Sequence, residues 1–332
     1  MDLFTLTRKL IDIPSITGNE GEVGRFLTSY LEGLHYRVEM QQVEEGRFNV
    51  IATTGGPVHA VFSTHMDTVP PFIQSSEDHE NIYGRGACDA KGIIAAQISA
   101  AERLRAGGQK EIGLLFSVDE ELGSKGAQAA NYHSLASECR FLINSETTDN
   151  RLAIGTKGSM RLIITTQGRS AHSAYPEAGE SAVEKLLDVL ESVRKSVWPA
   201  DSFFGETTCN IGVIAGGTRP NVIPDHARAE LQIRLGTDID EVKKIVSQAV
   251  AGRARIEYSS AHNPVRLFAV SGLEQCIVRF TTDIPYLSNW GQPILLGPGS
   301  ILDAHTEHER VSKRELERAV ELYMKLAEEL LS

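Results

Sequence analysis

The 332-residue sequence shows neither a secretory leader nor a membrane-spanning segment. Its first residues, MDLFTLTRKLIDIPSITG, contain no apolar core followed by a small-residue cleavage site. No stretch approaches the roughly 18 uninterrupted apolar residues that a membrane helix needs. We therefore expect neither export through a signal peptide nor a membrane anchor.

Cysteine is scarce, and basic residues are outnumbered by acidic ones. The four cysteines, Cys88, Cys139, Cys209 and Cys276, stand far apart, without the pairing of a disulfide scaffold or a zinc ribbon. A reducing cytoplasm is therefore the expected location. Lys and Arg number 33 against 44 Asp and Glu, which gives a net charge of −11. Because nucleic acids recruit basic surfaces, we expect no nucleic-acid partner.

Signatures of nucleotide-binding proteins and serine hydrolases are also missing. The Gly-rich segment YGRGACDAKG has Asp89 where a dinucleotide-binding motif needs its third glycine. Its Lys91 lacks the preceding Gly and the following Ser or Thr of a phosphate-binding loop. The sequence contains no G-x-S-x-G, and its one S-x-x-K, Ser192 to Lys195, falls inside a predicted helix. These absences exclude both nucleotide-binding motifs and disfavour a serine hydrolase.

Helical and extended hydrophobic patterns alternate between residues 17 and 145. Thr17 and Glu20 have the spacing of a capping box ahead of an apolar helical stripe from Val23 to Leu31. Strand patterns and further helical patterns follow in turn, separated by Gly, Asn or Asp. This alternation is typical of an α/β sheet with helices on its faces.

A different rhythm begins at about residue 158. The order becomes strand, helix, strand, strand, helix, strand, which is the ferredoxin-like arrangement. The alternating pattern of the first part then resumes and ends in a long helix. Ser312 and Glu315 have the spacing of a capping box at the start of this helix. We predict an α/β domain formed by residues 1–157 and 267–332, into which residues 158–266 are inserted as an α+β domain.

Carboxylates and imidazoles occur at the ends of predicted strands and in two loops. Three strand patterns, VFST, LLFSV and FLINS, run directly into such residues. Ligand sites of open α/β sheets gather beyond the carboxyl ends of the strands. Any one of these residues alone is more often a solvated loop residue or a helix cap, so their coincidence carries the inference. The candidates are His65, Asp67, Asp89, Asp119, Glu120, Glu121, Glu146 and His305.

This mixture of nitrogen and oxygen donors suits Zn²⁺, Co²⁺ or Mn²⁺. The three strand ends and the two loops could each supply one ligand. Five ligands and a water molecule are too many for one tetrahedral zinc, but they suit two metals that share a bridging ligand. Two metals about 3.5–4 Å apart are a known hydrolytic arrangement. The residues alone therefore favour a two-metal hydrolase.

Seven segments, in a fixed order along the chain, also carry a family resemblance. They are STHMDTVP, YGRGACDAKG, SVDEELGSKGA, NSET, GRSAHSAYP, NIGVIAGGTRPNVIPDHARAELQIRL and GPGSILDAHTEHE. Together they resemble the M20 metallopeptidases, which include acetylornithine deacetylase, succinyl-diaminopimelate desuccinylase, aminoacylases and carboxypeptidase G. The resemblance spans nearly the whole chain. It implies a zinc-peptidase-like α/β catalytic domain with an inserted ferredoxin-like lid that also forms a homodimer.

By position, the resemblance implies a ligand set for two zinc ions. Asp89 would bridge the two ions, His65 and Glu146 would hold one, and Glu121 and His305 the other. The third acidic ligand lacks the proline that usually follows it, and His308 stands where relatives carry Asp or Asn. The frame A-H-T-x-x-E nevertheless favours His305 as the ligand.

The resemblance also implies roles around the metals. Glu120 would be the general base, and Asp67 would accept the imidazole N–H of His65 and fix its tautomer. His172, in the lid, would stabilise the oxyanion in the active site of the other subunit. Arginine and glycine-rich backbone both suit a carboxylate. The candidates for the substrate's carboxylate are Arg234, Asn221 and the loop Gly297–Ser300, in particular Gly299 and Ser300.

Three functions remain at this stage. The first is a dizinc hydrolase of N-acyl amino acids, of the acetylornithine or acetyl-lysine deacetylase type. The second is a di- or carboxypeptidase that acts on short peptides with the same metals. The third is a metal-stabilised dimeric binding protein without activity, which the presence of Glu120 disfavours.

Overall fold

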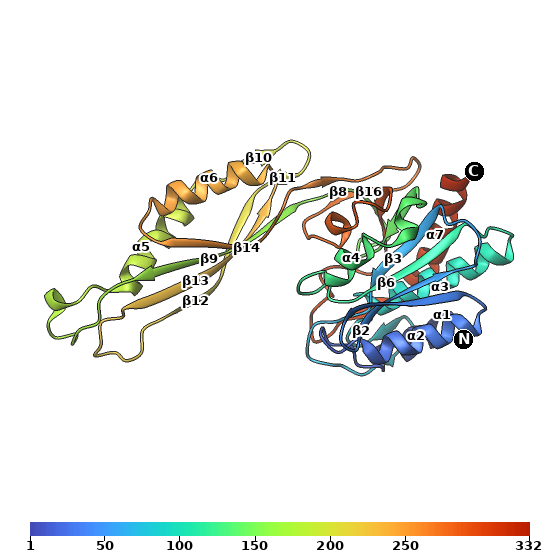
Figure 1. The fold of residues 1–332 in the computed structure, drawn as a ribbon, viewed down its shortest axis with the longest axis horizontal. Coiled ribbons are helices and arrows are strands. Elements are labelled where there is room, and N and C mark those ends of the chain that lie inside the picture. Colours follow the sequence, from blue (N-terminus) through green and yellow to red (C-terminus); the bar gives the residue numbers. More distant parts are fainter. The chain divides into compact units, whose positions relative to one another are not determined.

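The computed structural model describes residues 1–332, which form two compact units (Figure 1). Unit 1 comprises Met1–Ile154, Leu267–Cys276 and Thr282–Ser332, and unit 2 comprises Gly155–Arg266 and Ile277–Thr281. The predicted boundaries placed residues 155–157, and also the short stretch 277–281, in the first domain, whereas the structure groups both with unit 2. The N–H of Lys157 donates to the carbonyl of Val278 (3.0 Å), which ties this short stretch to the start of the insert.

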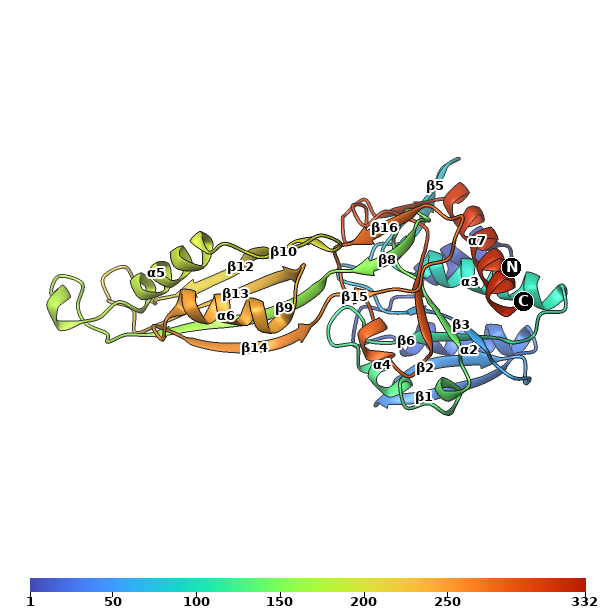
Figure 2. The ribbon, with the colours of Figure 1, turned by 90° about the horizontal axis from the view of Figure 1, so that it is seen from above.

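Unit 1 is built on a mixed sheet (Figure 2), and its central strands β3 and β6 are buried along their whole length. Strand β3 lies between β6 and β7 and runs parallel to both, and β17 runs parallel to β7. The carboxyl ends of these strands therefore meet at one edge of the sheet. The order is β1 (Arg37–Glu44), β2 (Arg47–Thr53), β6 (Ile112–Ser117), β3 (Ala60–His65), β7 (Phe141–Asn144), β17 (Gln292–Leu295), β8 (Leu152–Thr156) and β15 (Val265–Arg266), with β16 (Gln275–Val278) also paired to β8.

Both faces of this sheet carry apolar side chains because successive residues of a strand point to opposite faces. Phe62 of β3 belongs to the main core, whereas its neighbour Val61 packs in a smaller cluster around the buried Trp290. The indole N–H of Trp290 donates to the carbonyl of Ala130 (3.0 Å), so its one polar group is satisfied.

Five α-helices belong to unit 1. The alanine-rich α3 packs against β3, β6 and α7. The predicted capping box of Ser312 and Glu315 is confirmed at the start of α7. The capping box predicted for Thr17 and Glu20 is wrong, because the Glu20 carboxylate binds Arg47 and makes no cap to α2. The helices are α1 (Leu3–Ile11), α2 (Gly21–Gly33), α3 (Lys91–Ala106), α4 (Lys125–Ala130) and α7 (Lys313–Leu331), and a small sheet joins β18 (Arg310–Ser312), β5 (Asn81–Tyr83) and β4 (Ser76–Glu77).

Unit 2 has the predicted ferredoxin-like order. Its sheet runs β12-β13-β9-β14, so the fourth strand lies beside the first and the third beside the second. Helices α5 and α6 cover one face, where Leu186 and Val246 pack against Leu162 and Leu231 of the strands. The elements are β9 (Gly158–Gln167), α5 (Ala182–Lys195), β12 (Thr208–Gly216), β13 (His226–Leu235), α6 (Ile239–Val250) and β14 (Arg255–His262), with a short hairpin of β10 (Ala200–Asp201) and β11 (Gly205–Glu206).

The fold class predicted from the sequence is therefore confirmed as an α/β domain with an inserted ferredoxin-like α+β domain. None of the helices combines the length and the hydropathy that a membrane crossing requires.

Candidate metal centre

Three parallel strands deliver candidate ligands to one edge of the sheet in unit 1. His65 is the last residue of β3, Glu121 follows β6, and Glu146 follows β7. Asp89 lies in the loop just before α3, and His305 lies between β17 and β18. The structure brings all five predicted metal ligands into this one unit.

The carboxylate of Asp89 lies between two imidazoles. Its Oδ1 is 2.9 Å from Nε2 of His65, and its Oδ2 is 3.1 Å from Nε2 of His305. The same nitrogen of His305 is 2.9 Å from Oε1 of Glu121, and Nε2 of His65 is 3.8 Å from Oε2 of Glu146. Each oxygen of Asp89 thus faces a different histidine, which is the arrangement expected of a bridging carboxylate.

The donor set fits divalent metal ions. Potential ligand atoms of His65, Asp89 and Glu121 all lie within 4.8 Å of one another. Two imidazole nitrogens and three carboxylates are borderline and hard ligands of the kind that Zn²⁺, Co²⁺ and Mn²⁺ accept. Asp89, His65 and Glu146 could hold one ion, and Asp89, Glu121 and His305 a second.

The electrostatics of the site favour bound positive charge. Burial raises the pKa of Glu146 and of Glu120; neighbouring carboxylates raise both further, and the charge of His65 opposes the shift. Burial opposes protonation of His65, but the carboxylates of Glu146, Asp67 and Asp89 outweigh it and raise the pKa of the imidazole. Hydrogen bonds to Asp89 and Glu121 raise the pKa of His305 to about 10. Divalent cations would satisfy the same atoms in place of these protons.

Asp67 contacts both His65 and the segment that carries the acidic pair. Nδ1 of His65 is 2.9 Å from the backbone carbonyl of Asp67 and 3.5 Å from its carboxylate, so the carbonyl is the nearer partner. The carboxylate accepts the N–H groups of Glu120 (3.1 Å) and Glu121 (3.2 Å) and the hydroxyl of Thr17 (2.8 Å). The side chain of Asp67 therefore fixes the turn of Glu120 and Glu121 as well as facing the histidine.

Glu309, to which the sequence analysis assigned no role, holds the loop that carries Asp89. Its Oε1 accepts the backbone N–H groups of Gly86 (2.9 Å), Asp89 (3.2 Å) and Cys88 (3.3 Å). Its Oε2 accepts the guanidinium of Arg85 (2.6 Å). The available signal was the frame A-H-T-x-x-E, in which Glu309 is the final residue.

His308, the alternative histidine, is exposed. Its backbone N–H donates to the hydroxyl of Thr306 (3.3 Å). The contacts with Asp89 and Glu121 are made by the ring of His305. This geometry favours His305 as the candidate ligand.

The predicted carboxylate-binding loop packs directly onto the segments that carry two candidate ligands. A Cβ on Gly297 would lie 2.5 Å from the carbonyl oxygen of Glu146, and one on Gly299 would lie 2.5 Å from Cβ of Cys88. Gly299 also has a φ of +83°, which disfavours any other residue. Glycine is therefore required at both positions for the loop to approach the centre.

The remaining predicted residues, His172, Asn221 and Arg234, belong to unit 2. His172 forms a backbone bridge with Val222, and the N–H of Ser173 donates to the carbonyl of Asn221 (3.1 Å). Arg234 lies near the other end of β13, eight residues beyond His226, or about 26 Å at 3.3 Å per residue. The structure brings His172 and Asn221 together and places Arg234 of the same chain far from both.

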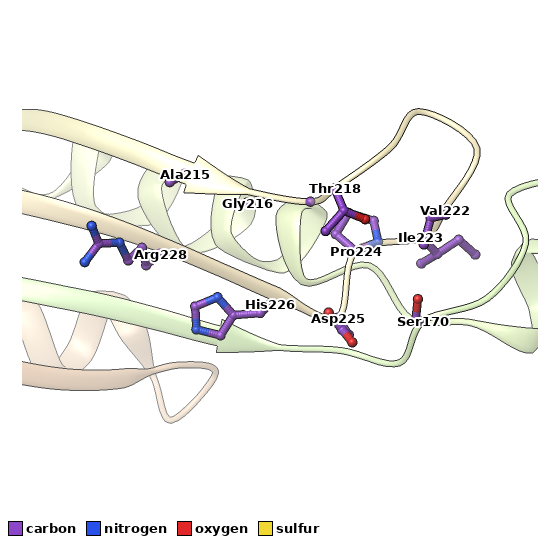
Figure 3. Close-up of a pocket in the computed structure, with 11 residues that line it drawn as sticks. Ser170, Ala215, Gly216, Thr218, Val222, Ile223, Pro224, Asp225, His226 and Arg228 are labelled. Carbon is purple, nitrogen blue, oxygen red and sulfur yellow. The ribbon is translucent and has the colours of Figure 1, made fainter.

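A pocket of about 310 Å³ lies beside the loop of Asn221 in unit 2 (Figure 3). Its lining includes Val222, Ile223 and Pro224 of that loop. It also includes His226 and Arg228, which lie two residues apart on β13 and so on the same face of the strand. The segments that carry His172 and Asn221 thus border a cavity with a basic side chain.

Comparisons with known proteins identify the family. Residues 154–258 match the peptidase dimerisation domain model, and residues 49–196 match a peptidase family M28 model. A peptidase M20 domain-containing protein of Schizosaccharomyces pombe is 35% identical, with 98% of this chain and 84% of that protein covered. A probable carboxypeptidase of Emericella nidulans is 37% identical, with 97% and 88% covered. The chain belongs to the M20 peptidase family. It is therefore a metal-dependent hydrolase of C–N amide bonds.

Solved structures share the fold of this M20 peptidase. An aminopeptidase, PepT, of Bacillus cereus has a TM-score of 0.79 at 22% identity, covering 99% of this chain and 98% of that one. An M20 family metallo-carboxypeptidase of Sulfolobus solfataricus has a TM-score of 0.77 at 16% identity, covering 96% and 97%. A dinuclear metal-binding M20 peptidase of Bacillus subtilis has a TM-score of 0.69 at 16% identity, covering 98% and 96%. M20 peptidases are dinuclear metal enzymes, and the five candidate ligands suit two ions.

Metal content tests the ligand set. Asp89→Ala should retain little metal because both of its oxygens face ligand histidines, whereas His305→Ala should lose about one ion of the pair. Elemental analysis of dialysed protein measures this, and an unchanged melting temperature of the metal-free variants shows that they fold. His308→Ala is the matched control and should keep both ions. Loss of metal from His308→Ala but not from His305→Ala would show that the assignment of His305 as the ligand is wrong.

Proposed function

We propose that this M20 peptidase is a dizinc hydrolase that releases an amino acid from short peptides with a free carboxyl terminus. The observation that carries the proposal is the Asp89 carboxylate between His65 and His305, with Glu120 one residue from the candidate ligand Glu121. The names of the relatives, probable carboxypeptidases, favour a peptidase over the deacetylase that the sequence suggested. Hydrolysis of N-acyl amino acids remains a second candidate because it breaks the same kind of bond.

The metal ions would be held by the five candidate ligands. Asp89 would contact both ions, His65 and Glu146 one, and Glu121 and His305 the other. Bound zinc would polarise the scissile carbonyl and lower the pKa of a water molecule.

Glu120 is the proposed general base. It follows β6 on the same turn as Glu121, and its backbone N–H is fixed by Asp67 (3.1 Å). Burial, the charge of Glu146 and that of Asp283 raise its pKa, which suits a carboxylate that accepts a proton from the attacking water. The same carboxyl group would then donate that proton to the leaving amine nitrogen. Because Glu121 is a separate candidate ligand, one turn supplies both a ligand and a base.

Binding of the substrate's carboxylate is assigned to Arg234, Asn221, Gly299 and Ser300. Arg234 and Asn221 lie too far apart along one chain to hold a single small carboxylate. We therefore assign the two side chains to different subunits of a dimer. His172, which lies beside the loop of Asn221, would come from the partner together with it and stabilise the oxyanion.

The homodimer is proposed to form through unit 2. The matched model is a peptidase dimerisation domain, and β12 is an edge strand of its sheet. Val213 and Ile214 on this strand are 44% and 56% exposed. An exposed edge strand of nine residues with apolar side chains is a ready site for pairing with another chain. All four cysteines are free, which fits the proposed cytoplasmic location.

A substrate panel tests the proposed reaction. Dipeptides and tripeptides with a free carboxyl terminus should be cleaved faster than acetylated amino acids by the protein loaded with zinc or cobalt. Amidation of the terminal carboxylate should lower kcat/KM by at least about 10-fold, because it removes the charge that the arginine would bind. Faster cleavage of acetylated amino acids would favour the deacylase, and no cleavage of either class would refute the proposal.

Substitution of the base separates its role from that of a ligand. Glu120→Gln should keep both metals while turnover falls by about 10²-fold or more, since an amide cannot accept the proton. Metal analysis and kcat are measured on the same preparation. A variant that loses metal, or that turns over normally, would show that Glu120 and Glu121 do not have separate roles.

Mixed dimers test the cross-subunit role of His172. Glu120→Gln and His172→Ala homodimers should each be nearly inactive, because every active site lacks one group. A heterodimer of the two has one site with both groups intact, so about half of the wild-type activity should return. The separated heterodimer, made by co-expression, is assayed for kcat, size and metal content. Activity at the parental level, with normal size and metal, would mean that His172 does not act across the dimer.

A further inference from the structure

A buried ion network lies behind the turn that carries Glu120 and Glu121. Arg47, at the start of β2, binds Glu20 through Nε (2.8 Å) and Nη2 (2.6 Å), which is a two-pronged contact. The same Nη2 is 2.7 Å from Oδ1 of Asp119, the residue before Glu120. The side chains of Arg47, Glu20 and Asp119 are 10%, 0% and 5% exposed. One guanidinium therefore joins two buried carboxylates.

Asp119 has a backbone conformation that needs support. Its φ is +72°, in the left-handed region that residues other than glycine rarely adopt. Its carbonyl accepts the N–H groups of Gly123 (3.0 Å) and Ser124 (2.6 Å), which closes a tight turn around Glu120 and Glu121. The directions of these two side chains depend on this turn, and Arg47 holds its first residue.

The opposite side of the turn is held by Asp67, and the two contacts are connected. Asp67 accepts the N–H groups of Glu120 and Glu121 and the hydroxyl of Thr17. Thr17 lies three residues before Glu20, and the N–H of Gly18 donates to Oε1 of Glu20 (3.1 Å). A closed circuit thus runs from Asp67 through the segment 17–20 to Arg47, Asp119 and back to Asp67.

Stability alone gives a poor account of this network. Removing charges from water is costly, and well-packed apolar residues often replace a buried ion network without loss of stability. Here two buried carboxylates share one guanidinium, whose remaining partner, Glu44, is 40% exposed. Directional hydrogen bonds do, however, hold an arginine and its partners in one relative orientation. Apolar packing defines such an orientation less precisely.

We propose that Arg47 is a positioning residue of the metal centre. Acting through Asp119, it sets Glu121 to face Asp89 and His305 and leaves Glu120 to serve as the base. The assignment of ligand and base rests on the proposed function, whereas the effect on metal binding requires only that this centre binds metal.

The test compares Arg47→Met and Asp119→Asn with the wild type. Metal-free protein is titrated with Co²⁺ while its visible absorption spectrum is recorded, and kcat and KM are then measured with a dipeptide. Both variants should bind at least one Co²⁺ about 10-fold or more weakly with an altered spectrum, and kcat should fall about 10- to 100-fold while KM changes less than about 3-fold. Arg47→Lys keeps the charge but loses the two-pronged contact. Its cobalt affinity and kcat should lie between those of Arg47→Met and those of the wild type.

Glu44→Gln is the matched control. Glu44 contacts the same guanidinium (2.5 Å) and the ammonium of Lys125, just after the turn, but it is 40% exposed and forms no ion pair with Asp119. Cobalt affinity, spectrum and kcat of this variant should equal those of the wild type. The same losses in Glu44→Gln would show that any disturbance of Arg47 suffices, and would overturn the route through Asp119.

Two results would refute the proposal outright. The first is a lower melting temperature of Arg47→Met with an unchanged cobalt spectrum, affinity and kcat, which would make the network purely structural. The second, decisive where Arg47→Met does not fold, is wild-type cobalt binding by Asp119→Asn, which is nearly isosteric. A wild type that binds cobalt but cleaves no amide would refute the proposed function alone, and a wild type that binds no cobalt would refute both.

Discussion

Crowded negative charge is the constraint on which the rest of unit 1 depends. The carboxyl groups of Asp89, Glu120, Glu121 and Glu146 converge at one sheet edge, and only two imidazoles lie among them. Like charges repel strongly where protein excludes water, and burial, together with that repulsion, raises the pKa values of Glu120 and Glu146. Such a cluster persists only where cations, hydrogen-bond donors or protons compensate it. The centre is thus an arrangement that the fold must impose rather than one that it would adopt for stability.

Two further buried acids hold this arrangement in place by fixing the backbone of two ligand-bearing segments. Glu309 gathers three N–H groups of the loop of Asp89, and Asp67 gathers those of Glu120 and Glu121. Each accepts main-chain donors that a tight loop would otherwise leave without partners. Part of the acidic excess of the chain is therefore structural and buried, rather than a surface field for a charged partner.

The sequence predicts those features that need only local pattern and one topological rule. Strands that end in His65 or just before Glu146 are visible as short apolar runs, and parallel pairing brings their ends together. Features formed between distant segments could not be read in this way. Glu20 binds Arg47 across 27 residues of sequence, and Glu309 binds Gly86 across 223. No local spacing in the sequence therefore indicates which residues form these pairs. The local spacing of Thr17 and Glu20 even favoured a helix cap, and a tertiary ion pair took its place.

The division between the units also explains why the fold alone leaves the substrate open. Solved structures at 14–22% identity carry the names aminopeptidase, carboxypeptidase and dipeptidase. The candidate ligands and the proposed base are confined to unit 1, and of the proposed bond-breaking groups only His172 belongs to unit 2. Choosing one end of a peptide needs a charge opposite to that of the end: carboxylates for a free amino terminus, or cations and backbone N–H groups for a free carboxyl terminus. Most acids nearest the centre serve as candidate ligands, base or loop anchors, and Asp283, buried beside Glu120, accepts the hydroxyl of Ser117. The Gly297–Ser300 loop brings backbone against Cys88 and Glu146. The proposed choice of a free carboxyl terminus therefore rests on this loop and on the side chains of unit 2, and the bond-breaking residues alone do not determine it.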